Sequence, residues 1–158
     1  MYKKWRVALI LGIIVFATFF FYWQYWERNK YHFRVIFFNV GQGDAALINF
    51  SNGQKMLVDC GPDATVLSRL GAYLPFYDHV IDYLVVSHPD LDHYGGCIDV
   101  LKKYQVNNII ENGDQKFNDQ YWQNRNLFAN KERANRFVPT NKYTFWLLGG
   151  EKVEFFKT

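Results

Sequence analysis

The sequence predicts one membrane-spanning helix followed by a single domain of mixed strands and helices, an α/β or α+β sandwich. Three observations lead to this prediction. An uncharged apolar stretch occupies residues 7–26, strand-like and helix-like segments alternate from residue 32 onward, and the 158 residues are 49% hydrophobic with only two cysteines. This composition excludes a disordered chain and a small disulfide scaffold. The length suits one domain.

The apolar stretch Val7–Trp26 reads VALILGIIVFATFFFYWQYW. Twenty residues of α-helix span about 30 Å, the thickness of the hydrocarbon core of a bilayer. The aromatic residues at its end match an interfacial belt, whereas a signal peptide would need small residues at a cleavage site. We therefore expect residues 1–30 to be an uncleaved anchor that contacts the membrane through residues 7–26.

The positive charge of the chain belongs to this anchor. Residues 1–30 contain five Lys or Arg and one Glu, whereas residues 31–158 contain 13 Lys or Arg and 14 Asp or Glu. The net charge of +3 is therefore no sign of nucleic-acid binding. Basic residues before the span favour a single-pass topology with residues 31–158 outside the cytoplasm.

The first half of the domain predicts four strands and a helix. Residues 32–40 and 44–50 are rich in β-branched and aromatic residues and flank a glycine-containing turn, which indicates a hairpin. A third strand, 55–60, follows the turn at Ser51-Asn52-Gly53. A helix capped by Asp63 then ends before Pro75, and 82–87 form a short apolar strand. At helical spacing, the side chains expected to be buried in this helix are Val66, Leu67, Leu70, Tyr73 and Leu74.

The second half predicts a helix at 97–104 and a short strand at 108–111. A polar, aromatic-bearing helix follows at 118–133. Residues 143–148 and 152–156, joined across Gly149-Gly150, predict a hairpin.

The candidate site is the segment SHPDLDHYGG, residues 87–96. His88, Asp90, Asp92 and His93 follow an apolar strand at its carboxyl end, where side chains converge in a crevice. Imidazole and carboxylate together suit zinc, manganese or iron, and four donors in so short a loop fit two adjacent ions better than one. The alternative is that these residues only cap turns.

Four ordered motifs resemble the metallo-β-lactamase superfamily, in the ComEC-type group of DNA-uptake proteins. HPDLDH resembles the superfamily's HxHxDH signature with one aspartate substitution, FNVGQGD at 38–44 resembles DVGQGD, and LVDCGP at 57–62 resembles LIDGGP. The fourth is the segment 74–82 that leads into the histidine motif. The resemblance implies an αββα sandwich, of which residues 31–158 would form the N-terminal half.

The resemblance also implies roles for single residues. His88 would bind the first of two divalent ions, zinc or manganese, with Asp90 in the place of a second histidine. Asp92 and His93 would bind the second ion, and Asp92 would also orient the attacking water as the catalytic residue. Further residues are expected in the second shell or at the rim of the site: Asp59, Asp44, Gly43 and Gly95. Asp59 and Asp44 could instead simply cap turns.

Two questions remain open at this point. Cys60 is expected to be a small buried residue rather than a nucleophile, and its pairing with Cys97 is an unsupported option. Residues 125–142 are basic and lie near Trp122, which indicates either a groove for a phosphodiester backbone or the solvated face of a helix.

The expected function is that of a membrane-anchored metallo-hydrolase acting on a phosphodiester such as single-stranded DNA. The superfamily's remaining ligands lie in the second half of its fold, and His93 is the last histidine of this chain. We therefore expect a fragment of a longer enzyme. The alternative is a short, non-catalytic remnant tethered to the membrane, or a metal-binding module with half the fold. The sequence indicates no protein partner.

Overall fold

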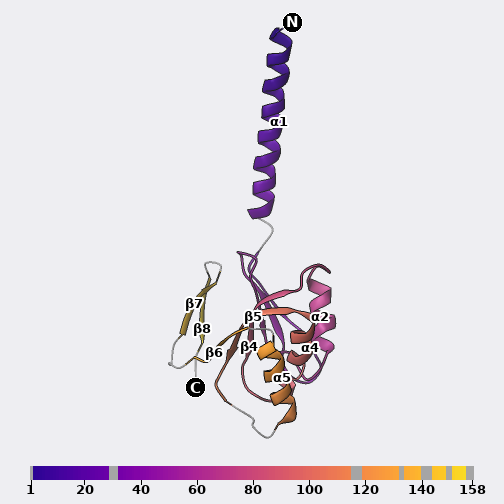
Figure 1. Ribbon diagram of the computed structural model, residues 1–158, viewed down its shortest axis with the longest axis vertical. Helices are drawn as coiled ribbons and strands as arrows, with labels where there is room; N and C mark the ends of the chain where they lie inside the picture. The colour runs from indigo at the N-terminus through magenta and orange to yellow at the C-terminus, as the bar shows by residue number, and fades with distance from the viewer. Residues whose placement is uncertain are drawn as a thin grey trace. The chain divides into compact units, whose positions relative to one another are not determined.

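The computed structural model describes residues 2–28, 32–114, 119–131, 134–139, 144–148 and 151–155. The chain divides into two compact units, residues 1–32 and 33–158. The first unit contains α1 (Tyr2–Arg28), a helix of 27 residues (Figure 1). Its segment Leu9–Trp26 is, within the described residues, the one helical stretch long and apolar enough to cross a membrane. The large apolar side chains of this segment are exposed.

The second unit is built on a mixed six-stranded sheet in the order β1-β2-β3-β4-β5-β6. The sheet pairs antiparallel from β1 to β3 and parallel from β3 to β6. Its strands are β1 (Arg34–Phe37), β2 (Ala46–Asn49), β3 (Lys55–Val58), β4 (Val80–Val86), β5 (Gln105–Glu111) and β6 (Asn135–Phe137). The predicted α/β class is confirmed.

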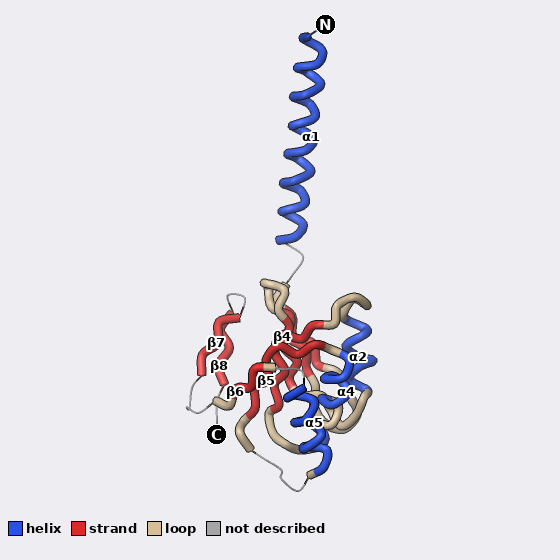
Figure 2. Tube along the Cα trace, viewed as in Figure 1, coloured by secondary structure: helices blue, strands red, loops and turns tan. Residues whose placement is uncertain are grey.

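The helices are α2 (Thr65–Tyr73), α3 (Leu91–Tyr94), α4 (Cys97–Lys103) and α5 (Gln120–Lys131), and a separate hairpin comprises β7 (Thr144–Leu148) and β8 (Glu151–Phe155). Figure 2 shows α2, α4 and α5 on one side of the sheet and the β7–β8 hairpin on the other. The sheet therefore has one face covered by helices and a second face that meets the hairpin.

The strand directions define two edges of the sheet. Because β1 and β3 are both antiparallel to β2, they run in the same direction as β4, β5 and β6. We call the edge where β1, β3, β4 and β5 begin the leading edge, and the edge where they end the trailing edge. β4 has seven residues, so the two edges are about 20 Å apart.

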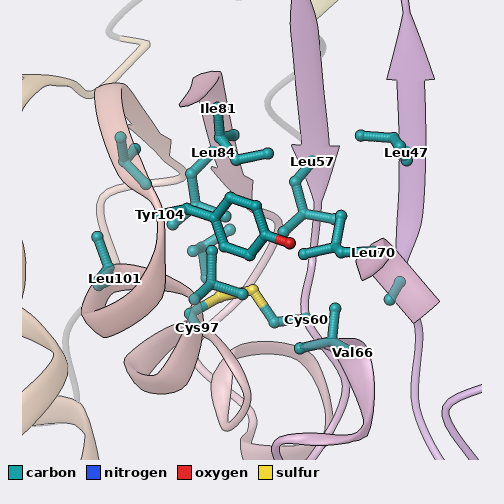
Figure 3. Packing of buried hydrophobic residues seen from close by; sticks show 14 of the residues in the cluster. Leu47, Leu57, Cys60, Val66, Leu70, Ile81, Leu84, Cys97, Leu101 and Tyr104 are labelled. Atoms are coloured by element: carbon teal, nitrogen blue, oxygen red, sulfur yellow. A yellow bond between two sulfur atoms is a disulfide. The ribbon is translucent and has the colours of Figure 1, made fainter. Parts of the chain in front are cut away.

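The larger hydrophobic core lies between the sheet and the helices. Leu70 of α2 and Leu101 of α4 pack against strand residues such as Leu57 and Leu84, and all four are buried (Figure 3). Each fully buried leucine contributes about 2 kcal/mol to folding. A smaller cluster on the second face consists of Phe50, Met56, Val85 and Ile110, with Val153 of β8 packed against it.

The element bounds differ from the predictions in instructive ways. The helix α3 and the strand β6 were not predicted, because one helical turn and three strand residues are too short for a periodic pattern. The N-cap of α2 is Ala64 rather than Asp63. The Asp63 carboxylate accepts a hydrogen bond from the Thr65 backbone N–H at 2.8 Å. The Thr65 side chain, followed by this backbone N–H, lowers the pKa of Asp63. Tyr73 is exposed rather than buried.

A buried ion pair corrects both interpretations of the basic segment at Arg125. Arg125 has an exposed fraction of 0% and pairs with Glu111, the last residue of β5, while Arg136 pairs with the same carboxylate at 2.8 Å. The Arg125 guanidinium lies 4.1 Å from the centre of the buried Trp122 ring. Neither Arg125 nor Trp122 therefore lines a solvent-exposed groove, and Arg125 does not lie on a solvated helix face. Burial lowers the pKa of Arg125, and the charge of Glu111 opposes that shift.

The Arg125→Met variant should lower the free energy of unfolding by about 3 kcal/mol, because it leaves the buried Glu111 with Arg136 as its remaining guanidinium partner. Urea unfolding of the full chain in detergent measures the change. The control is Lys102→Met, which removes an exposed pair with Asp99 and should cost less than about 1 kcal/mol. Equal losses in the two variants would contradict the prediction.

Candidate functional site

The trailing edge of the sheet brings most of the predicted site residues together. Asp59 follows β3, and the loop from Ser87 to Asp90 follows β4 and leads into α3. Val58 and Val85 are paired in the parallel β3–β4 register, so the two strand ends lie side by side. Asp92 and His93 lie on α3, the one-turn helix that ends this loop.

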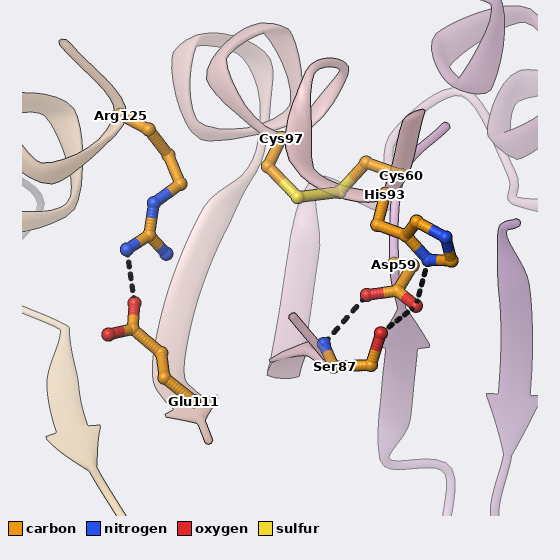
Figure 4. Close-up of a disulfide and its surroundings, with 7 residues drawn as sticks. All are labelled: Asp59, Cys60, Ser87, His93, Cys97, Glu111 and Arg125. Atoms are coloured by element: carbon orange, nitrogen blue, oxygen red, sulfur yellow. Dashed lines mark hydrogen bonds and ion pairs between the residues drawn. A yellow bond between two sulfur atoms is a disulfide. The ribbon is translucent and has the colours of Figure 1, made fainter. Parts of the chain in front are cut away.

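Asp59 holds the loop through three hydrogen bonds. Its carboxylate accepts the backbone N–H of Ser87 at 2.8 Å and the Ser87 hydroxyl at 2.6 Å, and it lies 3.0 Å from Nδ1 of His93 (Figure 4). Asp59 is buried and has a φ of 55°, a left-handed conformation that is uncommon for a residue with a side chain. If Nδ1 carries the proton, the Nε2 atom of His93 is a free lone-pair donor.

The four candidate metal ligands of the loop form two pairs. His88 Nε2 lies 3.4 Å from an Asp90 carboxylate oxygen, and His93 Nε2 lies 3.9 Å from an Asp92 carboxylate oxygen. The two imidazole rings are 3.8 Å apart between centroids. In the part of the chain that the structure describes, no three His, Cys, Asp or Glu side chains surround one point. The donor types nevertheless suit a borderline divalent cation such as zinc or manganese.

Two glycines allow the backbone to approach this loop closely. Gly43 has a φ of 99°, and a β-carbon there would overlap the backbone carbonyl of Asp92. A β-carbon at Gly95 would overlap the carbonyl of Pro62. The Asp44 side chain is exposed, while its carbonyl accepts a hydrogen bond from the Gly61 N–H at 2.8 Å.

Cys60 and Cys97 form a disulfide with a Cα–Cα distance of 5.2 Å across 37 residues (Figure 4). Cys60 is buried, as expected, and the pairing with Cys97 that the sequence left unsupported is present. The disulfide joins the residue after Asp59 to the first residue of α4. Its signal in the sequence was weak, because only the position of each cysteine beside a site motif related the two.

Tyr94 connects the loop to α5, and sequence reasoning missed it. Its hydroxyl donates to Asp119 at 2.7 Å, and its ring lies edge-on to Trp122 with centroids 4.9 Å apart. Burial, followed by the hydrogen bond to Asp119, raises the pKa of Tyr94, so the phenol stays protonated at neutral pH. Ser87 was also missed. In the sequence, the only indication of a role for Ser87 and Tyr94 is that each lies directly beside a histidine of the motif.

Comparison with known proteins agrees with the motifs. The family model described as the Metallo-beta-lactamase superfamily matches residues 38–157. The chain is also 30% identical over 99 residues to Recombination protein 2 of Haemophilus influenzae, an alignment that covers 60% of this chain and 12% of that protein. The chain thus matches a small part of that relative's length. The match supports the resemblance to the ComEC-type group.

Replacing both cysteines, Cys60→Ala with Cys97→Ala, should lower the free energy of unfolding by about 4 kcal/mol, because the disulfide restricts the unfolded chain across a long loop. Near-UV circular dichroism of urea-treated full chain in detergent measures the loss. Reductant should produce the same loss in the wild type and none in the double variant. Two titratable thiols in unreduced protein from an oxidising preparation would contradict the prediction.

Gly43→Ala and Gly41→Ala form a matched pair that tests the close approach to Asp92. Both glycines have left-handed φ, 99° and 83°, but a β-carbon at Gly41 meets nothing within 4 Å. Gly41→Ala should cost about 1 kcal/mol from backbone strain alone, and Gly43→Ala about 3 kcal/mol because the Asp92 carbonyl must also move. Equal unfolding free energies for the two variants would show that the loops do not touch there.

Proposed function

Because the chain belongs to the metallo-β-lactamase superfamily, we propose that it is a membrane-anchored, metal-dependent hydrolase of phosphodiesters. The observation that carries the proposal is the hydrogen bond between Asp59 and Nδ1 of His93. A carboxylate that holds one imidazole nitrogen and leaves the other free is the usual support of a metal-binding histidine. His93 also pairs with Asp92, and one further pair, His88 with Asp90, lies in the same loop.

In this proposal His88 and Asp90 hold one divalent ion, and Asp92 and His93 hold another. The ions would supply Lewis acidity, lowering the pKa of water and polarising the phosphoryl group. Asp92 is half-buried, so its second carboxylate oxygen can orient a water molecule toward a substrate. Asp59 positions His93, and Gly43 lets the loop before β2 close over Asp92.

A phosphodiester substrate, single-stranded DNA included, is supported by the ComEC-type resemblance and by a relative whose name assigns it to recombination. The basic residues of α5 add little support, since Arg125 is committed to Glu111. Arg136 is partly exposed and also pairs with Glu111.

A position outside the cytoplasm is supported by two independent features. The helix α1 has the length and composition of a membrane span, and its basic N-terminal flank favours the cytoplasmic side. The Cys60–Cys97 disulfide is a bond that persists in oxidising compartments. We therefore place the domain on the outer side of a single-pass anchor.

A second candidate function is a non-catalytic module tethered to the membrane. It is favoured by the absence, among the described residues, of three donor side chains around one point. Such a module would keep the braced loop, with or without a bound metal ion, but would not cleave a phosphodiester. Metal-dependent cleavage separates the two functions.

The full chain in nanodiscs should bind Zn²⁺ or Mn²⁺ and cleave single-stranded DNA or bis(p-nitrophenyl) phosphate, and a chelator should abolish the cleavage. His93→Ala should abolish both properties because it removes a ligand. Asp59→Asn should weaken metal affinity about 10- to 100-fold because it disturbs the support of that ligand. Isothermal titration and cleavage rates measure the two effects.

His79→Ala is the matched control, because His79 is exposed and lies at the leading edge, before β4. It should leave metal affinity unchanged. The hydrolase proposal would be overturned if the wild-type chain bound no metal, or if His93→Ala cleaved as fast as the wild type. The tethered module would then be the remaining function.

A further inference from the structure

Two adjacent aromatic side chains project from the loop between α2 and β4. Phe76 has an exposed fraction of 90% and Tyr77 of 67%. Their rings pack edge-to-face on one another with centroids 5.3 Å apart. Large apolar side chains grouped on a surface mark a contact with another apolar phase or molecule.

The structure holds this loop in place. The Asp78 carboxylate accepts two hydrogen bonds from Lys55 Nζ, at 2.8 and 2.9 Å, and the Asp78 N–H donates to the Pro75 carbonyl at 2.9 Å. The next residue, His79, accepts a hydrogen bond from the Gln105 N–H at 2.8 Å. The aromatic pair is therefore presented from a loop tied to β3 and β5.

The loop lies at the leading edge, where the chain also enters the sheet. Through the strand pairing, Arg34, the first residue of β1, lies level with Lys55 of β3 and Asp82 of β4. β4 begins two residues before Asp82, so its start projects beyond the start of β1 at the leading edge. Phe33, just before β1, is also exposed. β1 and β4 are three strand spacings apart, about 14 Å.

The covalent chain limits the distance between the last residue of α1 and Phe33. Whatever conformation residues 29–32 adopt, the five peptide steps from Arg28 to Phe33 span at most about 18 Å. Aromatic side chains concentrate where a bilayer meets water, since their rings favour the headgroup level. The partner that suits the exposed Phe76–Tyr77 pair is therefore the surface of the bilayer that the anchor crosses.

We propose that Phe76 and Tyr77 insert into the bilayer interface, so that the leading edge of the sheet faces the membrane. This inference rests on the membrane anchor of the proposed function. The trailing edge, with Asp59 and His93, then lies about 20 Å from the lipid, the length of β4. The site opens into water, and its substrate is a soluble molecule rather than a membrane lipid.

The test places the photo-cross-linker p-benzoylphenylalanine at position 76 in the full chain in nanodiscs, with mass spectrometry of lipid adducts. Position 20, within the apolar segment of α1, is the positive control for the anchor. Position 91 is the matched control, because Leu91 is an exposed apolar residue at the trailing edge. Lipid adducts should be roughly tenfold more abundant at position 76 than at position 91, as interfacial insertion requires.

Adducts at positions 20 and 76 with few at position 91 would support the proposal. Adducts at position 20 but not at position 76, equal adducts at positions 76 and 91, or protein–protein cross-links from position 76 in place of lipid adducts would each overturn it and leave the anchor standing. Absence of lipid adducts at position 20 as well would overturn the anchor and the insertion together.

Discussion

The three hydrogen bonds of the Asp59 carboxylate are the interaction on which the candidate site depends. They join the end of β3 to the start of the loop at Ser87 and to its end at His93. A buried carboxylate is costly unless its oxygens are satisfied, and here both oxygens accept. The left-handed backbone of Asp59 is retained because these partners and the β3–β4 pairing fix its position together.

Other contacts reinforce the same junction from several sides. The Cys60 N–H donates to the His93 carbonyl at 2.7 Å, and the Gly96 N–H donates to the Gly61 carbonyl at 2.9 Å. The disulfide restricts the unfolded chain, whereas these hydrogen bonds shape the folded loop. Tyr94 anchors the loop's far end in the helical core. A loop of polar donors is thus held with little freedom although many of its side chains are exposed.

Local patterns in the sequence were sufficient to predict most of the strands and the larger helices, whereas metal binding by His88, Asp90, Asp92 and His93 stays a prediction. They also singled out Asp59, because it ends an apolar strand within a family motif. Three interactions join residues that are far apart in the chain: the disulfide, the Tyr94–Asp119 hydrogen bond and the ion pair of the buried Arg125 with Glu111. Periodicity cannot reveal such pairs, so a basic, aromatic helix such as α5 has the same pattern whether its arginine faces water or Glu111.

The parallel pairing of β3 with β4 affects the order in which the parts of the domain fold. β1, β2 and β3 are joined by short turns and can pair as soon as they are made. The partners of Asp59 lie 28 and 34 residues further along, beyond the crossover through α2, and closing such a loop costs entropy before any contact forms. During synthesis β1, β2 and β3 can therefore pair before the candidate site forms. The loop held by Asp59 folds late.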